Sequence, residues 1–247
     1  MKEIDKKHCL LFKVKEVWFA DDVFDVNGYS CVVFRGCEKK IDISGFQCYE
    51  SATLVIDLTQ TLDKIWDNFG RSSCKYCIKK AIKDGIEVRM NERYKEFCVM
   101  NKTFRKSKKL TTSLVHSPMF FEKNGVLFIA ELHDEMLGGS FFIEDESRIR
   151  WIVGASKRLS VSTGKAGLIG CANRLILWEA IKYAKNKGLK EFDFGGYPIS
   201  PNVSDDVSKV NAFKKSWGGN LTLQYNYVKN YSLFYRIYKK IYMMIVG

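Results

Sequence analysis

Short hydrophobic runs separated by turn residues fill the first fifty positions of the chain. The runs at 9–14, 16–20 and 29–35 are rich in aromatic and β-branched residues, and each is followed by charged residues or by glycine. This alternation is typical of hairpins or of a β-meander. The run at 53–58 predicts one more strand before the pattern changes.

Helical spacing replaces the strand pattern after residue 59. Hydrophobic residues at 62, 65, 66 and 69 recur every three or four positions, which predicts a helix with Thr59 or Thr61 as its N-cap. Residues 73–84 predict a second helix that ends at Gly85, and a strand is expected at 86–90. Residues 91–109 predict a basic helix.

The second half of the chain predicts an antiparallel sheet followed by one long helix. Strands are expected at 119–123, 126–133, 138–145 and 148–156, with Asn124-Gly125 as the hairpin turn between the first two. After a polar loop at 156–167, the hydrophobic spacing of 168–187 predicts the clearest helix, which ends at Gly188. Further strands are expected at 189–194 and 220–228.

This order of elements predicts an α+β fold in which helices pack on a mixed sheet. The first half of the chain shows a rougher version of the order found in the second half, so the pattern allows two related lobes. The corresponding boundaries are a partial lobe at 1–112, a second lobe at 113–230 and a basic amphipathic tail at 231–247. A chain of 247 residues is long enough to bury a substantial core in such a fold.

The net charge of +12 narrows the expected partners. Basic residues cluster at 79–80, 105–109 and 236–240. A positive field favours polyanions such as phosphorylated substrates, RNA or an anionic membrane surface, although any single cluster is also what a solvated lysine-rich face shows. The charged first residues do not form a signal peptide, and no stretch reaches the roughly 18 apolar residues of a spanning helix, so we expect a cytoplasmic protein.

The cysteines and histidines do not predict a metal site. The eight cysteines are scattered among apolar neighbours, as small hydrophobic residues are in a reducing compartment. Cys74 and Cys77 form a CxxC pair, but no second pair and no paired histidines follow at zinc-site spacing. We therefore expect no metal and no tightly bound cofactor.

The loop at 156–167 is a candidate phosphate contact because it lies between a strand and a helix N-terminus. It is not a P-loop, since Leu159 stands where the first glycine belongs. Ser162, Thr163 and Lys165 are the residues that would contact a phosphate. The alternative is a solvent-exposed loop that only caps the helix.

Two Gly-Gly pairs lie about twenty residues apart near the end of the chain. Strand alternation places Asp193 on the face opposite Phe192 and Phe194, and Gly195-Gly196, followed by Tyr197, permits a bulge or a close approach of a ligand. Asp193 would orient an amine or a lysine, or bond to the next turn.

Two adjacent lysines precede the second Gly-Gly pair. Lys214 and Lys215 lie between Phe213 and Trp217, so one lysine is expected to point inward and the other into solvent. An inward lysine binds phosphate or stabilises an oxyanion.

These motifs carry a family resemblance. The stretch 192–196, FDFGG, and the stretch 213–219, FKKSWGG, resemble the FDFGG and FKxxFGG signature of the FemAB-like branch of the GNAT superfamily, which includes peptidoglycan bridge-forming aminoacyltransferases and BioF2-like acetyltransferases. The helix at 175–188, the strand at 151–155 and the region 53–85 are similar to that family's preceding segments, in family order. The resemblance covers about residues 53 to 225 and implies a GNAT-like fold.

The resemblance implies acyl transfer to an amine. Family members move an aminoacyl group from aminoacyl-tRNA to a peptidoglycan precursor, or an acyl group to another amine in polysaccharide synthesis, where acyl-CoA is an alternative co-substrate. By position, Lys214 matches the lysine that acts near the reacting carbonyl, and Lys79 and Lys75 match basic positions for the acceptor's phosphates. The chain has Trp217 and Lys79 where the family pattern has Phe and Arg.

The tail at 231–247 predicts an amphipathic helix. Phe234, Ile237, Ile241, Met244 and Ile245 share one helical face, and Arg236, Lys239 and Lys240 lie on another. An interfacial helix at the inner face of the membrane shows this pattern, and so does a helix docked on the protein's own core.

Two classes of function remain open from the sequence. The first is an N-acyltransferase, dependent on aminoacyl-tRNA or acyl-CoA, that acts on a phosphorylated cell-envelope precursor. The second is a non-catalytic basic module that binds RNA or membrane.

Overall fold

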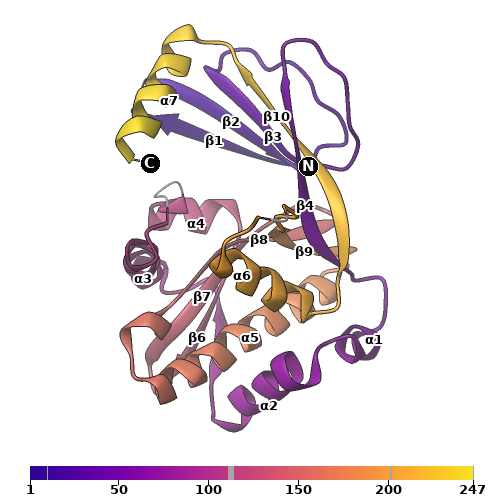
Figure 1. Ribbon diagram of the computed structural model, residues 1–247, viewed down its shortest axis with the longest axis vertical. Helices are drawn as coiled ribbons and strands as arrows, with labels where there is room; N and C mark the ends of the chain where they lie inside the picture. The colour runs from indigo at the N-terminus through magenta and orange to yellow at the C-terminus, as the bar shows by residue number, and fades with distance from the viewer. Residues whose placement is uncertain (10, 111–113, 201, 247) are drawn as a thin grey trace. The chain divides into compact units, whose positions relative to one another are not determined.

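The computed structural model describes residues 1–9, 11–110, 114–200 and 202–246 and divides into two compact units (Figure 1). Unit 1 comprises residues 1–53, 196–199 and 221–247, and unit 2 comprises residues 54–195 and 200–220. These units come from the packing of the chain and have other limits than the lobes predicted at 1–112 and 113–230. The predicted lobes therefore stay a prediction.

Unit 2 is built on a mixed sheet with the strand order β4-β9-β8-β7-β6-β5. The strands are β4 (Gln47–Asp57, of which the last four residues belong to unit 2), β5 (Glu87–Met90), β6 (Val126–Leu132), β7 (Glu135–Glu144), β8 (Arg148–Ser156) and β9 (Glu191–Gly196). Strands β5 to β8 pair antiparallel, whereas β8 and β9 pair parallel, as strands joined by a crossover helix do.

Helices cover both faces of this sheet. They are α1 (Leu62–Asp67), the π-helical turn η1 (Arg71–Lys75), α2 (Tyr76–Lys83), α3 (Tyr94–Ser107), α4 (Pro118–Asn124), the 3-10 turn η3 (Lys157–Ser160), α5 (Thr163–Asn186) and α6 (Asp205–Lys215). A side chain at Gly138 would meet Asn173 of α5, and one at Gly139 would meet Phe97 of α3. Because successive residues of a strand face opposite sides, α5 and α3 lie on opposite faces of β7.

The core of unit 2 is aromatic. Phe97, Phe121 and Phe141 pack edge to face under α3 and α4, and Phe142 contacts Phe192. Helix α5 buries ten residues, among them Leu175, Ile176 and Ala180. This burial explains why 168–187 gives the clearest helical pattern in the sequence.

Unit 1 contains further strands of mixed pairing and one helix. Strands β1 (Lys2–His8) and β2 (Phe12–Trp18) pair antiparallel, β2 and β3 (Cys31–Cys37) pair parallel, and β3 and β10 (Asn220–Asn230) pair antiparallel. One face is buried around Phe34 and Tyr227, and the other is covered by α7 (Leu233–Val246), where Tyr235 packs on Val14 and Val33.

The predicted hairpin at Asn124-Gly125 is wrong. Residues 118–124 form α4, because Pro118 occupies the first helical turn and the hydroxyl of Ser117 accepts the backbone N–H of Phe120. The hairpin turn lies instead at His133-Asp134, between β6 and β7, where both residues have positive φ.

Two further elements differ from the sequence prediction. The charged first residues form strand β1, whose exposed face accommodates the charges. The polar segment before the lysine pair contains helix α6, which Ser204 caps by accepting the backbone N–H of Val207. Of the two residues expected as the N-cap of the first helix, Thr59 and Thr61, the cap is Thr61, since its side chain accepts the backbone N–H of Lys64.

None of the helices in the described ranges is both long enough and apolar enough to cross a membrane.

Candidate active site at the end of strand β9

Lys214 is a buried cation at the C-terminal end of α6. Its residue is only 7% exposed, and its Nζ donates a hydrogen bond to the carbonyl oxygen of Gly195 at 3.2 Å. The ammonium also lies 6.0 Å from the centre of the Trp151 ring. Helix α6 therefore holds a lysine against the end of β9, and Lys214 is the inward member of the pair that the flanking aromatic residues predicted. Lys215 is the exposed member of the pair.

Burial sets the electrostatics of this lysine. It lowers the pKa of Lys214 to about 8, although the nearby Asp193 carboxylate acts in the opposite direction and Arg150 adds to the lowering. At neutral pH the side chain is therefore still mostly protonated. The site holds a positive charge in surroundings where charge interactions are stronger than in water.

Asp193 secures the backbone of the same strand end. One carboxylate oxygen accepts the backbone N–H of Gly195 at 2.6 Å, and the other accepts from the guanidinium of Arg150 at 3.1 Å. Asp193 and Arg150 are direct neighbours across the parallel β8–β9 pair. The carboxylate thus bonds to the next turn, which is one of the two roles that the sequence allowed for it.

Both the backbone conformation and the neighbouring atoms require a glycine at position 195. Its φ is +72°, in the left-handed region, and a Cβ there would lie 2.8 Å from the carbonyl oxygen of Trp151. The glycine allows β9 to turn at the position where its carbonyl meets Lys214. Gly196 and Tyr197 belong to unit 1, where the N–H of Tyr197 donates to the carbonyl of Ala52 at 2.7 Å.

The second Gly-Gly pair serves packing. Gly218 has φ +71°, and a Cβ there would lie 2.5 Å from the carbonyl oxygen of Asn68, which caps α1. Trp217 is completely buried and contacts the rings of Phe69 and Phe194. The tryptophan therefore fixes the end of α6 from within the core and does not line an open surface.

The predicted phosphate contacts Lys75 and Lys79 lie on η1 and α2. Lys75 pairs with Asp67, with 3.5 Å between Nζ and the carboxylate, and its ammonium lies 6.0 Å from the Trp66 ring. Lys79 is exposed on α2. Both remain predictions as phosphate contacts.

The loop residues Ser162, Thr163 and Lys165 begin helix α5. Ser162 is the N-cap residue, but its side chain makes no capping hydrogen bond, and Thr163 is exposed in the first turn. Lys165 donates to Glu135 at 2.7 Å, and Lys157 approaches the same carboxylate at 3.5 Å. The helix thus begins five residues earlier than the sequence predicted, and its first lysine is already paired.

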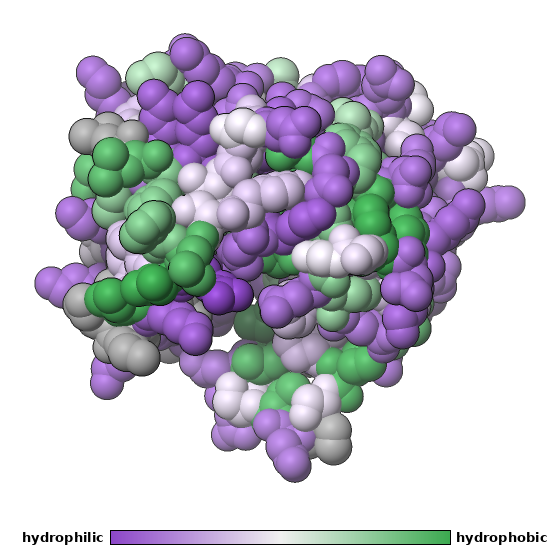
Figure 2. All heavy atoms as spheres, turned by 90° about the horizontal axis from the view of Figure 1, so that it is seen from above, coloured by the Kyte–Doolittle hydropathy of each residue, from purple (hydrophilic) through white to green (hydrophobic). Residues whose placement is uncertain are grey.

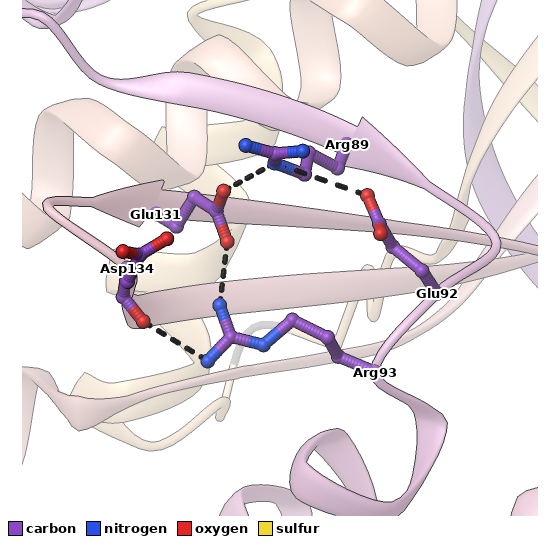
Figure 3. A pocket seen from close by; sticks show the side chains of 5 residues that line it. All are labelled: Arg89, Glu92, Arg93, Glu131 and Asp134. Atoms are coloured by element: carbon purple, nitrogen blue, oxygen red, sulfur yellow. Dashed lines mark hydrogen bonds and ion pairs between the residues drawn. The ribbon is translucent and has the colours of Figure 1, made fainter.

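An open pocket of about 280 Å³ lies elsewhere in unit 2 (Figure 3). It is lined by Arg89, Glu92, Arg93, Glu131 and Asp134. The buried carboxylate of Glu131 accepts from both guanidinium groups, and Arg93, which has φ +54°, also donates to Glu96. The acids and bases here pair with one another, which indicates a cluster that fixes the β5–α3 connection.

No metal centre emerges from the part of the chain that the structure describes. Nowhere in these ranges do three histidine, cysteine or acidic side chains gather closely enough to hold an ion. All eight cysteines are free thiols, and burial raises the pKa of Cys74.

Sequence reasoning missed Arg150 and Trp151 as members of the site. Both lie on β8, where the hydrophobic pattern indicated only a strand. Arg150 is a charged residue within that hydrophobic run, and its side chain is only 12% exposed. The sequence did contain one indication of this role: a charged residue inside a predicted core strand needs a partner of opposite charge.

The comparisons with known proteins identify the fold. No family model and no curated protein sequence matches this chain. Among solved structures, that of FemX superposes with a TM-score of 0.64 at 16% identity and covers 97% of this chain and 86% of the FemX chain.

Two further solved structures have a similar fold. L-PGS from Bacillus licheniformis gives a TM-score of 0.56 at 15% identity over 89% of this chain and 74% of its own. The C-terminal domain of a putative lysylphosphatidylglycerol synthetase from Agrobacterium fabrum gives a TM-score of 0.54 at 9% identity over 81% of this chain and 68% of its own. With FemX, they confirm the predicted α+β, GNAT-like fold and, at the level of the fold, the resemblance to the FemAB-like branch.

Proposed function

We propose that this chain is an N-acyltransferase that moves an aminoacyl group from aminoacyl-tRNA onto an amine of a phosphorylated cell-envelope precursor in the cytoplasm. The observation that carries the proposal is the buried ammonium of Lys214, held against the glycine turn at the end of β9. The position of this lysine within the FKKSWGG stretch agrees with the family resemblance. The fold shared with FemX and L-PGS supports the same class of reaction.

The chemistry needs few groups. The acceptor amine attacks the ester carbonyl, a C–N bond forms, the carbonyl oxygen becomes an oxyanion, and the ester C–O bond then breaks. The amine proton leaves with the released hydroxyl or to solvent. Lys214 supplies the positive charge that stabilises the oxyanion, and this charge acts strongly because the site is largely shielded from water.

The remaining residues hold that charge in place. Asp193 fixes the Gly195 turn through the backbone N–H and is itself held by Arg150. A positioned charge that does not have to reorganise during the reaction contributes most to the rate. Asp193 and Arg150 are therefore positioning residues, and Lys214 is the catalytic one.

The proposal and its alternative differ in the acyl donor. The alternative is an N-acyltransferase of polysaccharide synthesis that uses acyl-CoA. One of the similar structures is described as a putative lysylphosphatidylglycerol synthetase, a name in which a lysyl group is attached to phosphatidylglycerol, and this favours an aminoacyl donor for a chain of this fold. At the N-terminus of α5, Gly167 stands where GNAT acetyltransferases carry an arginine or glutamine for the pyrophosphate of acetyl-CoA.

The test is a transfer assay with the purified chain. Mixed tRNA charged with radiolabelled amino acids and, separately, radiolabelled acetyl-CoA are offered with nucleotide-linked and lipid-linked muropeptide precursors. We expect the label to move from tRNA to an acceptor amine. The Lys214→Met variant, which preserves the side-chain volume, should lose this transfer, whereas Lys209→Met on the same helix should retain it.

Two results would count against the proposal. Transfer from acetyl-CoA alone would show that the donor is acyl-CoA and not aminoacyl-tRNA, but it would not contradict the proposed role of Lys214. Absence of transfer from either donor, with tRNA binding retained in Lys214→Met, would favour the non-catalytic basic module instead.

A further inference from the structure

Helix α7 has three distinct faces, and only one of them is used by the fold. Tyr235 is 3% exposed and packs on Val14, Cys31 and Val33 of the unit 1 sheet, and Tyr238 lies beside it against Phe12. The hydroxyl of Tyr235 meets the His8 ring at 2.9 Å, and the thiol of Cys9 donates to the hydroxyl of Tyr238. The helix is therefore docked on its own sheet by a row of tyrosines.

The next face of α7 is hydrophobic and exposed. Phe234 is 77% exposed, Ile237 47% and Ile241 52%. At about 100° per residue these three side chains fall within one sector of the helix, next to the tyrosine row. Leu11, 80% exposed, directly precedes the Phe12 that stacks on Tyr238, and adds to the apolar surface of unit 1.

The third face of α7 is basic. Arg236, Lys239 and Lys240 are exposed on the side of the helix roughly opposite the apolar sector, with Lys239 next to the tyrosine row, and residues 231–247 contain no acidic residue. In Figure 2, hydrophobic side chains gather beside hydrophilic ones at the left of the view, the side on which Figure 1 labels α7. A soluble surface has no need for this combination of a bulky apolar sector and an unbroken cationic one.

We propose that α7 is a docking helix for an anionic lipid bilayer. The apolar sector enters the boundary between headgroups and acyl chains, and the three cations lie at the level of the phosphates. Charge complementarity favours a lipid surface over a second copy of the chain, because α7 carries three exposed cations and no acidic residue, and a second copy would offer the same basic helix instead of anionic groups. The tyrosine row supplies the rigid attachment that transmits this binding to unit 1.

The docking is independent of the acyl transfer proposed above, so it is tested with vesicles that contain no acceptor. The full chain is sedimented with vesicles of phosphatidylcholine alone and with vesicles that also contain phosphatidylglycerol. We expect binding to the anionic vesicles, weakened by salt, and little binding to the neutral ones.

Three variants identify the surface. Phe234→Ser/Ile237→Ser should lower the partition coefficient at least tenfold, and Lys239→Gln/Lys240→Gln about 25-fold, since each charge contributes about fivefold. Ile82→Ser is the matched control, because Ile82 is 58% exposed on the basic helix α2 of unit 2, and it should bind as the unchanged chain does. All these side chains are exposed, so the fold, checked by circular dichroism, should be unaffected.

The proposal is overturned if the unchanged chain binds no vesicles, if it binds neutral and anionic vesicles equally, or if the apolar double variant binds as the unchanged chain does. If the unchanged chain self-associates without binding lipid, and the apolar double variant abolishes this self-association, the apolar sector binds a second copy of the chain. That result would also overturn the proposal of lipid docking.

Discussion

Replacing Lys214 with methionine should stabilise the protein at neutral pH. The pKa of this lysine is lowered from 10.5 to about 8, mainly by burial. The shift of about 2.5 units means that holding the charged form inside the fold costs about 3 kcal/mol at pH 7. Methionine has a similar volume and no charge, and it forfeits a hydrogen bond to Gly195 worth about 1 kcal/mol. The net expectation is a gain of about 2 kcal/mol.

The gain should depend on pH in a defined direction. Between pH 8 and 10.5 the unfolded chain binds the lysine's proton while the folded chain has released it, so the stability of the unchanged protein rises with pH across this window. The variant lacks this group. Its advantage should therefore be largest below pH 8 and should disappear as the pH approaches 10.5.

Thermal unfolding followed by tryptophan fluorescence measures this difference. For a chain of this length, about 2 kcal/mol corresponds to a rise in Tm of about 4 to 8 °C at pH 7. Lys209→Met, an exposed position on the same helix, should change the stability by less than about 0.5 kcal/mol. A lower Tm for Lys214→Met at pH 7, or a difference that is the same at pH 7 and pH 10, would refute the reasoning.

Two substitutions test how the site is held. Gly218→Ala should lower the free energy of unfolding by more than about 2 kcal/mol in a denaturant titration, because the backbone at Gly218 is left-handed and the new Cβ would meet Asn68. The control is Gly167→Ala, which lies in open space on a helix and should be neutral or slightly stabilising in the same titration. Arg150→Met should destabilise the protein by about 3 kcal/mol by leaving the buried Asp193 carboxylate without its arginine, and simultaneous replacement of Asp193 by Asn should restore part of that loss in a double-mutant cycle.

The sequence predicted most elements of the fold because hydrophobic spacing reports which face is buried. The strong pattern of 168–187 corresponds to a helix that buries one side against the sheet. The errors arose where short-range chemistry outweighed the pattern. Residues 119–123 have strand-like composition, but Ser117 and Pro118 begin a helix there. Asn124-Gly125 is a strong turn signal only between two strands, and here the residues before it are helical.

The site was predicted in part. The lysine pair with its aromatic neighbours indicated that one lysine is buried, and Lys214 is that residue. The partners of Asp193 were not predictable, because Arg150 is 43 residues away in sequence and becomes its neighbour only through the parallel pairing of β8 and β9. The purpose of the second Gly-Gly pair also depends on a distant residue, Asn68. Periodicity within one element carries no information on such contacts.

The pH dependence of the transfer rate tests the central claim, that the Lys214 ammonium stabilises the oxyanion. With saturating donor and acceptor, kcat should fall above about pH 8 as the lysine loses its proton, and Lys214→Met should be about 100-fold slower at pH 7. In Lys214→Arg, whose side chain stays charged, the decline above pH 8 should disappear. A Lys214→Met enzyme within threefold of the unchanged rate, or an unchanged decline above pH 8 in the arginine variant, would contradict the account.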